Sequence, residues 1–268
     1  MLENRIYAGA GKSTTLHWLT RFAGMSEEFC LQFLYKHSGK STHTTKLTSA
    51  LLYATRVFDT PGLPSLDDCA AYGMKWAAAG FWKENCIVTY LQRPTNITEE
   101  PLVSPNTRRC MHATPSPRTK AHGVLLLLSF TEDPATLDEY TALLKNLKEG
   151  EFVRWMGVEY YLEGIEPVLA VTHAPCKGGG RAPCASVDSA AVALFIRRLA
   201  YSADGDNAIL ITPGGPNECL LHGHGRKLCC VPELNYLPPR QYVAVLHALK
   251  AKAVTHIRAF RDALSKDN

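Results

Sequence analysis

The chain of 268 residues has no long hydrophobic run, because apolar stretches such as Val124 to Leu128 are far too short to cross a bilayer. Its N-terminus also lacks a basic region followed by an apolar one, so the sequence predicts neither a membrane span nor a secretory signal. A strong excess of charge is absent as well, since 29 basic and 25 acidic side chains leave a formal charge of +4. So small and evenly spread a charge argues against nucleic acid as the main partner.

Regular cysteine spacing is also missing. The nine cysteines are an odd number without a pattern, which suits a reducing compartment better than a disulfide framework, so we expect a cytoplasmic protein. We find no internal repeat. With 46% hydrophobic and 20% charged residues the chain can bury one substantial core, and we expect a single domain over residues 1–268.

The strongest motif is Gly9-Ala10-Gly11-Lys12-Ser13-Thr14. Its glycines let backbone N–H groups approach an anion, and a lysine and a hydroxyl then open a helix, which is typical of a loop that holds nucleotide phosphates. Lys12 is expected to reach the β- and γ-phosphates and Ser13 to ligate Mg²⁺, with the helix N-terminus favouring the negative charge. The full pattern has a further glycine where this chain has Ile6, and a glycine-rich turn that caps an ordinary helix is the alternative.

Only Met1 to Tyr7 precede this loop, where a phosphate-binding fold needs a buried strand. Glu3, Asn4 and Arg5 would be costly to bury there. We therefore expect that the first strand is truncated. An upstream reading frame without a hydrophobic strand ending in glycine would contradict this hypothesis.

Residues Lys36 to Lys46 are rich in Ser, Thr, His and Gly, and they predict a loop. In a nucleotide switch, a threonine in such a loop reaches Mg²⁺ and the γ-phosphate. The sequence does not choose between Thr42, Thr44 and Thr45, and an ordinary polar surface loop is an equal alternative for each. We assign the contact with Mg²⁺ and the γ-phosphate to Thr44.

Leu51 to Phe58 predicts a strand that leads into Asp59-Thr60-Pro61-Gly62-Leu63. The Asp59 carboxylate can hold a water of the Mg²⁺ shell, and the Gly62 amide can sense the γ-phosphate. Proline and glycine alone would also favour a simple tight turn. Because Leu63 stands where some hydrolases have a water-orienting glutamine, we expect slow intrinsic hydrolysis.

Further strands and helices are predicted downstream. Leu66 to Tyr90 has a helical pattern whose aromatic residues suit packing, and residues 93–120 are rich in Pro, Ser, Thr and Asn, which predicts a long exposed insertion. The other predicted elements are strands at Gly123–Ser129, Ile165–Val171 and Ala208–Thr212, and helices from Pro134 (capped by Asp133), at Val187–Leu199 and at Gln241–Leu264. This alternation predicts an α/β fold with a mostly parallel sheet and helices on both faces.

The order of these motifs, with Val171-Thr172-His173 at a strand end, resembles a P-loop GTPase domain. More narrowly, it looks like the interferon-induced-44-like proteins, and it is also similar to plant avirulence-induced and chloroplast-import (Toc) GTPases. The resemblance implies a three-layer P-loop NTPase sandwich, a single G domain, and a switch that binds GTP or GDP and acts with an unknown protein partner or by self-association.

The resemblance also implies a set of site residues, with Thr172 and His173 beside the guanine base. Pro175 stands where most GTPases have an aspartate that bonds both guanine nitrogens, which weakens the expected preference for GTP over ATP. The residues expected to bind the nucleotide are Gly9, Ala10, Gly11, Lys12, Ser13, Thr14, Asp59, Gly62, Thr172 and His173. Those expected to act in catalysis are Lys12, Thr44 and Gly62, and those expected around Mg²⁺ are Ser13, Thr44 and Asp59.

Three other functions stay open. A scaffold that keeps the fold with little or no turnover would explain Ile6, Leu63 and Pro175. An ATP-dependent kinase would need a lid of arginines, for which Arg108, Arg109 and Arg118 are available. A zinc module would use the residues between Cys219 and Cys230, although their spacing fits no standard zinc pattern and a plain loop is the alternative. The residues concerned are Cys219, His222, His224, Cys229 and Cys230.

Overall fold

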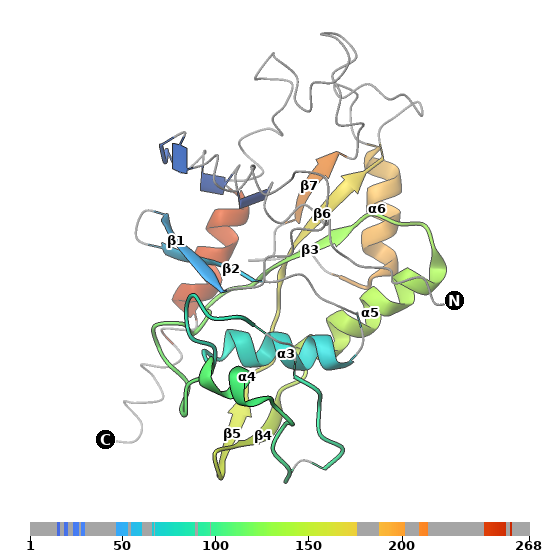
Figure 1. Ribbon diagram of the computed structural model, residues 1–268. Helices are drawn as coiled ribbons and strands as arrows, with labels where there is room; N and C mark the ends of the chain where they lie inside the picture. Colours follow the sequence, from blue (N-terminus) through green and yellow to red (C-terminus); the bar gives the residue numbers. More distant parts are fainter. Residues whose placement is uncertain are drawn as a thin grey trace. The chain divides into compact units, whose positions relative to one another are not determined.

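The computed structural model describes only part of the chain. The described residues are 15–16, 19–20, 24–26, 28–29, 47–52, 55–60, 66, 68–88, 91–96, 98–175, 188–201, 209–213, 244–255 and 258. The chain divides into two compact units, which we describe separately (Figure 1). Unit 1 is Met1–Val124 with Glu139–Glu166, and unit 2 is Leu125–Asp138 with Pro167–Asn268. The single domain over 1–268 stays a prediction.

Unit 1 contains an antiparallel hairpin of β1 (Thr48–Leu52) and β2 (Thr55–Asp59). The sequence predicted one strand from Leu51 to Phe58, which is wrong, because the chain reverses between Leu52 and Thr55. No glycine, proline or asparagine marks that reversal, so the apolar run looked continuous. The prediction that Asp59 ends a strand is confirmed.

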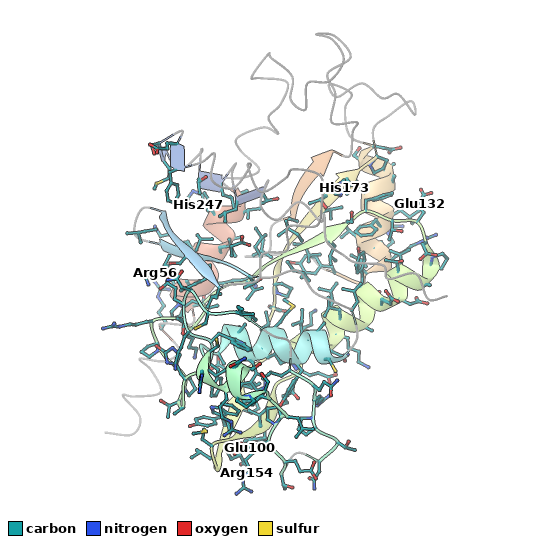
Figure 2. All side chains as sticks on the ribbon, in the orientation of Figure 1. Arg56, Glu100, Glu132, Arg154, His173 and His247 are labelled. Carbon is teal, nitrogen blue, oxygen red and sulfur yellow. The ribbon has the colours of Figure 1, made fainter. Side chains whose placement is uncertain are left out.

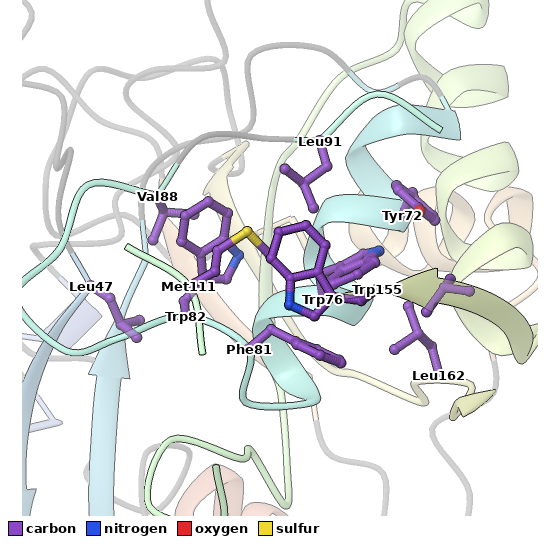
Figure 3. Packing of buried hydrophobic residues seen from close by; sticks show 11 residues of the cluster. Leu47, Tyr72, Trp76, Phe81, Trp82, Val88, Leu91, Met111, Trp155 and Leu162 are labelled. Atoms are coloured by element: carbon purple, nitrogen blue, oxygen red, sulfur yellow. The ribbon is translucent and has the colours of Figure 1, made fainter. Parts of the chain in front are cut away.

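Helix α3 (Asp68–Ala78) supports the aromatic core of unit 1. It is shorter than the predicted Leu66–Tyr90 helix, because Gly80 has a left-handed backbone (φ 88°) and ends it in a Schellman motif. In that motif the Phe81 N–H donates to the Trp76 carbonyl and the Gly80 N–H to the Ala77 carbonyl. The predicted packing role of the aromatics is confirmed, and Figure 3 shows them together: Tyr72, Trp76, Phe81 and Trp82 are all buried.

Residues 93–120 take part in this core instead of forming a purely exposed insertion. Ser104 caps the short helix α4 (Pro105–Arg109) by accepting a hydrogen bond from the Thr107 N–H at 3.1 Å. Thr107, Met111 and Thr119 are buried, and the His112 N–H donates to the Phe81 carbonyl. The predicted exposure is therefore wrong for these residues, because their serines and threonines form caps and turns.

A second hairpin, absent from the sequence prediction, joins β4 (Glu151–Trp155) and β5 (Val158–Leu162). Its turn residues Met156 (φ 53°) and Gly157 (φ 78°) both have positive φ, as a type I′ turn requires. Alternate residues of the strands face the aromatic core, where Val153, Trp155 and Leu162 are buried. The opposite face carries the exposed pair Phe152 and Tyr161.

Unit 2 contains a three-stranded parallel sheet in the order β3-β6-β7, formed by β3 (Leu125–Ser129), β6 (Val168–Ala174) and β7 (Ile209–Pro213). Residues Val168 to Val171 of the central strand are fully buried, as expected for a parallel strand covered on both faces. All three strands agree with the sequence prediction to within three residues. Figure 1 shows β6 between its two neighbours.

Helices accompany this sheet. Helix α5 (Pro134–Lys148) starts in unit 2 and continues into unit 1, and the predicted cap is confirmed because the Asp133 carboxylate accepts from the Thr136 N–H at 3.1 Å. Helix α6 (Ser189–Arg198) packs Phe195 on Phe130. Residues 244–255 are also helical, as predicted. The described structure is thus mixed α/β, and in it no helix is both long and apolar enough to cross a membrane.

Candidate functional site

The carboxyl end of the central strand β6 is the most irregular part of the parallel sheet. The register between β6 and β7 shifts between Val171 and Ala174, and His173 within this shift has a left-handed backbone (φ 55°). Positive φ is uncommon for a residue with a side chain, and bulges that re-aim a side chain are frequent beside active sites. The irregularity turns an exposed imidazole out at the strand end (Figure 2).

Two hydroxyls hold that imidazole. The Ser129 Oγ lies 2.8 Å from His173 Nδ1, and the Thr172 Oγ1 lies 3.2 Å from the same nitrogen. Ser129 is brought there by the parallel register, which places it opposite Thr172. Among the described residues, the hydrogen bonds of the ring are at Nδ1.

Partial loss of hydration lowers the pKa of His173 below its ordinary value of 6.5. The imidazole is therefore neutral at pH 7, with one nitrogen as donor and the other as acceptor. A neutral aromatic ring at this position can stack on a planar ligand or form one hydrogen bond with its edge.

The start of helix α6 is tied to the same strand end. The Asp188 N–H donates to the Pro175 carbonyl at 2.7 Å, and the Asp188 carboxylate caps α6 by accepting from the N–H groups of Ala190 and Ala191. Open α/β sheets bind ligands beyond the carboxyl ends of their strands. His173 thus lies at the edge where such a fold places its ligand.

Asp59 is the predicted metal-site residue that the structure describes, and it lies in unit 1. It is the last residue of β2 and is 7% exposed, directly before Thr60. A buried carboxylate at a strand end is suited to bind a cation or its hydration shell.

The other predicted site residues lie outside the described residues. These are Gly9, Ala10, Gly11, Lys12, Ser13, Thr14, Thr44 and Gly62, together with Cys219, His222, His224, Cys229 and Cys230. The helix expected after Thr14 is confirmed at residues 15–16 and 19–20. In the described part of the chain, no group of three His, Cys, Asp or Glu side chains is arranged to hold a metal ion.

Sequence reasoning missed Ser129. The residue is the first hydroxyl after the apolar run of β3, and a polar residue directly after a buried parallel strand is a signal that could have marked it. Its contact with His173 depends on strand pairing, which the local sequence does not specify.

Comparisons with protein-family models, curated proteins and solved structures found no match for this chain.

Proposed function

We propose that this chain binds a guanine nucleotide with Mg²⁺ through a P-loop and hydrolyses GTP slowly, acting as a switch. The observation that carries the proposal is the bulged end of β6, where an exposed His173 is held by Ser129 at the ligand-binding edge of a parallel sheet. The proposed fold is a three-layer P-loop sandwich.

The motif residues supply the phosphate and metal chemistry of the proposal. Lys12 offsets charge on the phosphates, while Ser13 and Thr44 ligate Mg²⁺ and Asp59 holds a water of its shell. The Gly62 amide contacts the γ-phosphate. The buried position of Asp59 at a strand end and the helix after Thr14 support these roles.

Base recognition falls to Thr172 and His173. A neutral imidazole stacks on a purine without the desolvation cost of a charged ring. Pro175 offers no side-chain acceptor, so the charged contact that most GTPases make with guanine, worth about 1.5–3 kcal/mol, is lost. We therefore expect only a modest preference for GTP over ATP.

Hydrolysis in this proposal is slow without help. Leu63 cannot orient the attacking water, so a switch threonine does so, and an arginine from a partner or from a second copy of the chain stabilises the transition state. If the turnover rate per molecule did not change with protein concentration or with added partners, the proposal that another molecule supplies an arginine would be contradicted.

The test is a titration of the full chain with fluorescent GTP and ATP analogues, with and without Mg²⁺. We expect Mg²⁺-dependent binding that is lost in Lys12→Ala and weakened in His173→Ala. The matched control is His247→Ala, which removes an exposed histidine from the helix at residues 244–255.

The competing function is a scaffold that binds nucleotide weakly or without turnover, favoured by Ile6, Leu63 and Pro175. Binding of neither analogue would overturn the GTPase proposal in its favour. Binding without release of phosphate would support the nucleotide site and would contradict the proposed hydrolysis of GTP.

A further inference from the structure

The β4–β5 hairpin of unit 1 carries a large share of the exposed apolar side chains. Of the nine large hydrophobic side chains that are exposed in the described part of the chain, four belong to this hairpin. They are Phe152, Met156, Val158 and Tyr161. Exposed apolar side chains that are scattered singly are ordinary, whereas a cluster on one element is typical of a surface that another molecule covers.

The strand register divides the hairpin into two faces. Alternate residues face the aromatic core, and the residues between them form the outer face. On this outer face Phe152 of β4 lies opposite Tyr161 of β5. Two residues nearer the turn, Arg154 of β4 lies opposite Glu159 of β5. The outer face therefore consists of one aromatic pair and one pair of opposite charges.

All four side chains of the outer face are open to a partner. Phe152 is 50% exposed and Tyr161 is 57% exposed, and their ring centroids lie 5.0 Å apart. Arg154 and Glu159 are also exposed, and in the described part of the chain neither forms an ion pair. One positive and one negative charge give a strongly charged partner no net attraction. A surface with the same two charges in exchanged positions would pair with both.

We propose that the outer face binds the same face of a second copy of the chain. The two copies are related by a two-fold axis that runs parallel to the strands, midway between β4 and β5. Rotation about this axis places each β4 over β5 of the other copy, as in two sheets that pack face to face. Phe152 then packs on the partner's Tyr161, and Arg154 lies opposite the partner's Glu159. Each contact occurs twice, since the interface is isologous.

The size of the face sets the expected affinity. Two strands of five residues provide a small interface, of the class below about 1,200 Å² that is typical of weak or transient complexes. Aromatic and arginine side chains carry most of the energy of such contacts, and this face offers both. We therefore expect a monomer–dimer equilibrium with a Kd of about 10–500 µM. None of its four residues belongs to the proposed nucleotide site, so the dimer forms without nucleotide.

The first experiment is sedimentation equilibrium of the full chain without nucleotide, at about 5–500 µM. Phe152→Ser and Tyr161→Ser should each weaken the dimer by about tenfold or more, because each removes an aromatic contact that occurs twice. Both side chains lie outside the core, so these variants keep the fold. The matched control is Leu194→Ser on α6, which removes a side chain of similar exposure (48%) and should leave the dimer unchanged.

Exchange of the two charges tests the two-fold arrangement. Arg154→Glu places acidic side chains opposite each other across the interface, and Glu159→Arg places basic ones there, so each variant alone should weaken the dimer by about tenfold. The double variant Arg154→Glu/Glu159→Arg should regain the affinity of the wild type. An equimolar mixture of the two single variants should form a heterodimer, because an acidic face then meets a basic one. A loss of folding cannot produce association in the mixture alone.

Two exposed residues elsewhere control for net charge. Arg118→Glu and Glu132→Arg make the same changes of charge outside the hairpin and should not affect the dimer. The proposal is overturned if the chain stays monomeric at about 500 µM, if Phe152→Ser dimerises as well as Leu194→Ser, or if the mixture of single variants associates no better than each variant alone. Dimerisation only with GTP would also overturn it, by assigning the contact to the nucleotide site.

Discussion

Among individual side chains, the buried pair of Lys75 and Glu151 allows the sharpest stability prediction. Lys75→Met leaves the 9%-exposed Glu151 carboxylate with Arg93 as its remaining partner, so we expect a loss of about 1–3 kcal/mol in the free energy of unfolding. The double variant Lys75→Met/Glu151→Leu should regain most of this loss, because the buried carboxylate is removed together with its buried partner. Urea denaturation measures both.

The control for that prediction is an ion pair on the surface. Arg56 and Glu84 lie 3.3 Å apart with side chains that are substantially exposed, so Arg56→Gln should cost less than about 1 kcal/mol. Equal losses for Lys75→Met and Arg56→Gln would contradict the assignment of the buried pair.

His173 predicts a dependence of stability on pH. Its pKa is lowered in the folded state, so below about pH 6.5 the unfolded chain binds a proton that the folded chain resists. The contribution of His173 is thus present above its unfolded pKa and is lost as pH falls toward its folded pKa. His173→Gln should lose less stability than the wild type between pH 7 and pH 5.

Unfolding by urea at a series of pH values measures this difference. His247→Gln is the control, since it removes a histidine elsewhere in unit 2. The same fall in stability for His173→Gln and the wild type would show that His173 is hydrated as fully when folded as when unfolded.

For single residues, the sequence predicted where a side chain lies in the fold better than it predicted which other residue that side chain contacts. Asp59 and the Thr172-His173 pair follow apolar runs, so their places at strand ends could be predicted. The contact of Ser129 with His173 spans 44 residues and that of Lys75 with Glu151 spans 76. Such contacts are set by how strands and helices pair, which no local pattern records.

Among helices and turns, alanine substitutions at two glycines with positive φ distinguish the cost of backbone strain from the cost of a steric clash. Gly157 (φ 78°) has open space around an added Cβ, so Gly157→Ala should cost about 1–2 kcal/mol from backbone strain alone. At Gly80 (φ 88°) an added Cβ would lie 2.5 Å from the Ser116 carbonyl oxygen as well as straining the helix end. Gly80→Ala should therefore be the more damaging variant, with a loss above about 3 kcal/mol.

Thermal and urea unfolding of the two variants tests this order. The loop of Gly157 serves as the matched control, because it carries the same strain without the clash. A cost for Gly157→Ala equal to that for Gly80→Ala would show that the contact between α3 and residues 116–120 yields easily.

A helix was predictable where an apolar periodicity in the sequence began at a residue that can cap a helix. Asp133 and the spacing of Leu137, Tyr140 and Leu144 identify α5. The hairpins were not predicted, for different reasons. The alternation in β4 and β5 is blurred because Phe152 and Tyr161 are apolar on the exposed face, whereas the reversal between β1 and β2 lacks the usual turn residues.

For the chain as a whole, the proposed function predicts stabilisation by nucleotide. GTP with Mg²⁺ at a hundred times its dissociation constant should raise the free energy of unfolding by about 2.7 kcal/mol, because it binds only the folded chain. ATP at the same concentration should give a rise within about 1.5 kcal/mol of this, since Pro175 provides no carboxylate to select guanine.

Lys12→Ala should remove the stabilisation by both nucleotides without changing the stability of the unliganded chain. Thermal unfolding with and without Mg²⁺ measures it, and an equal rise in Lys12→Ala would place the nucleotide at another site.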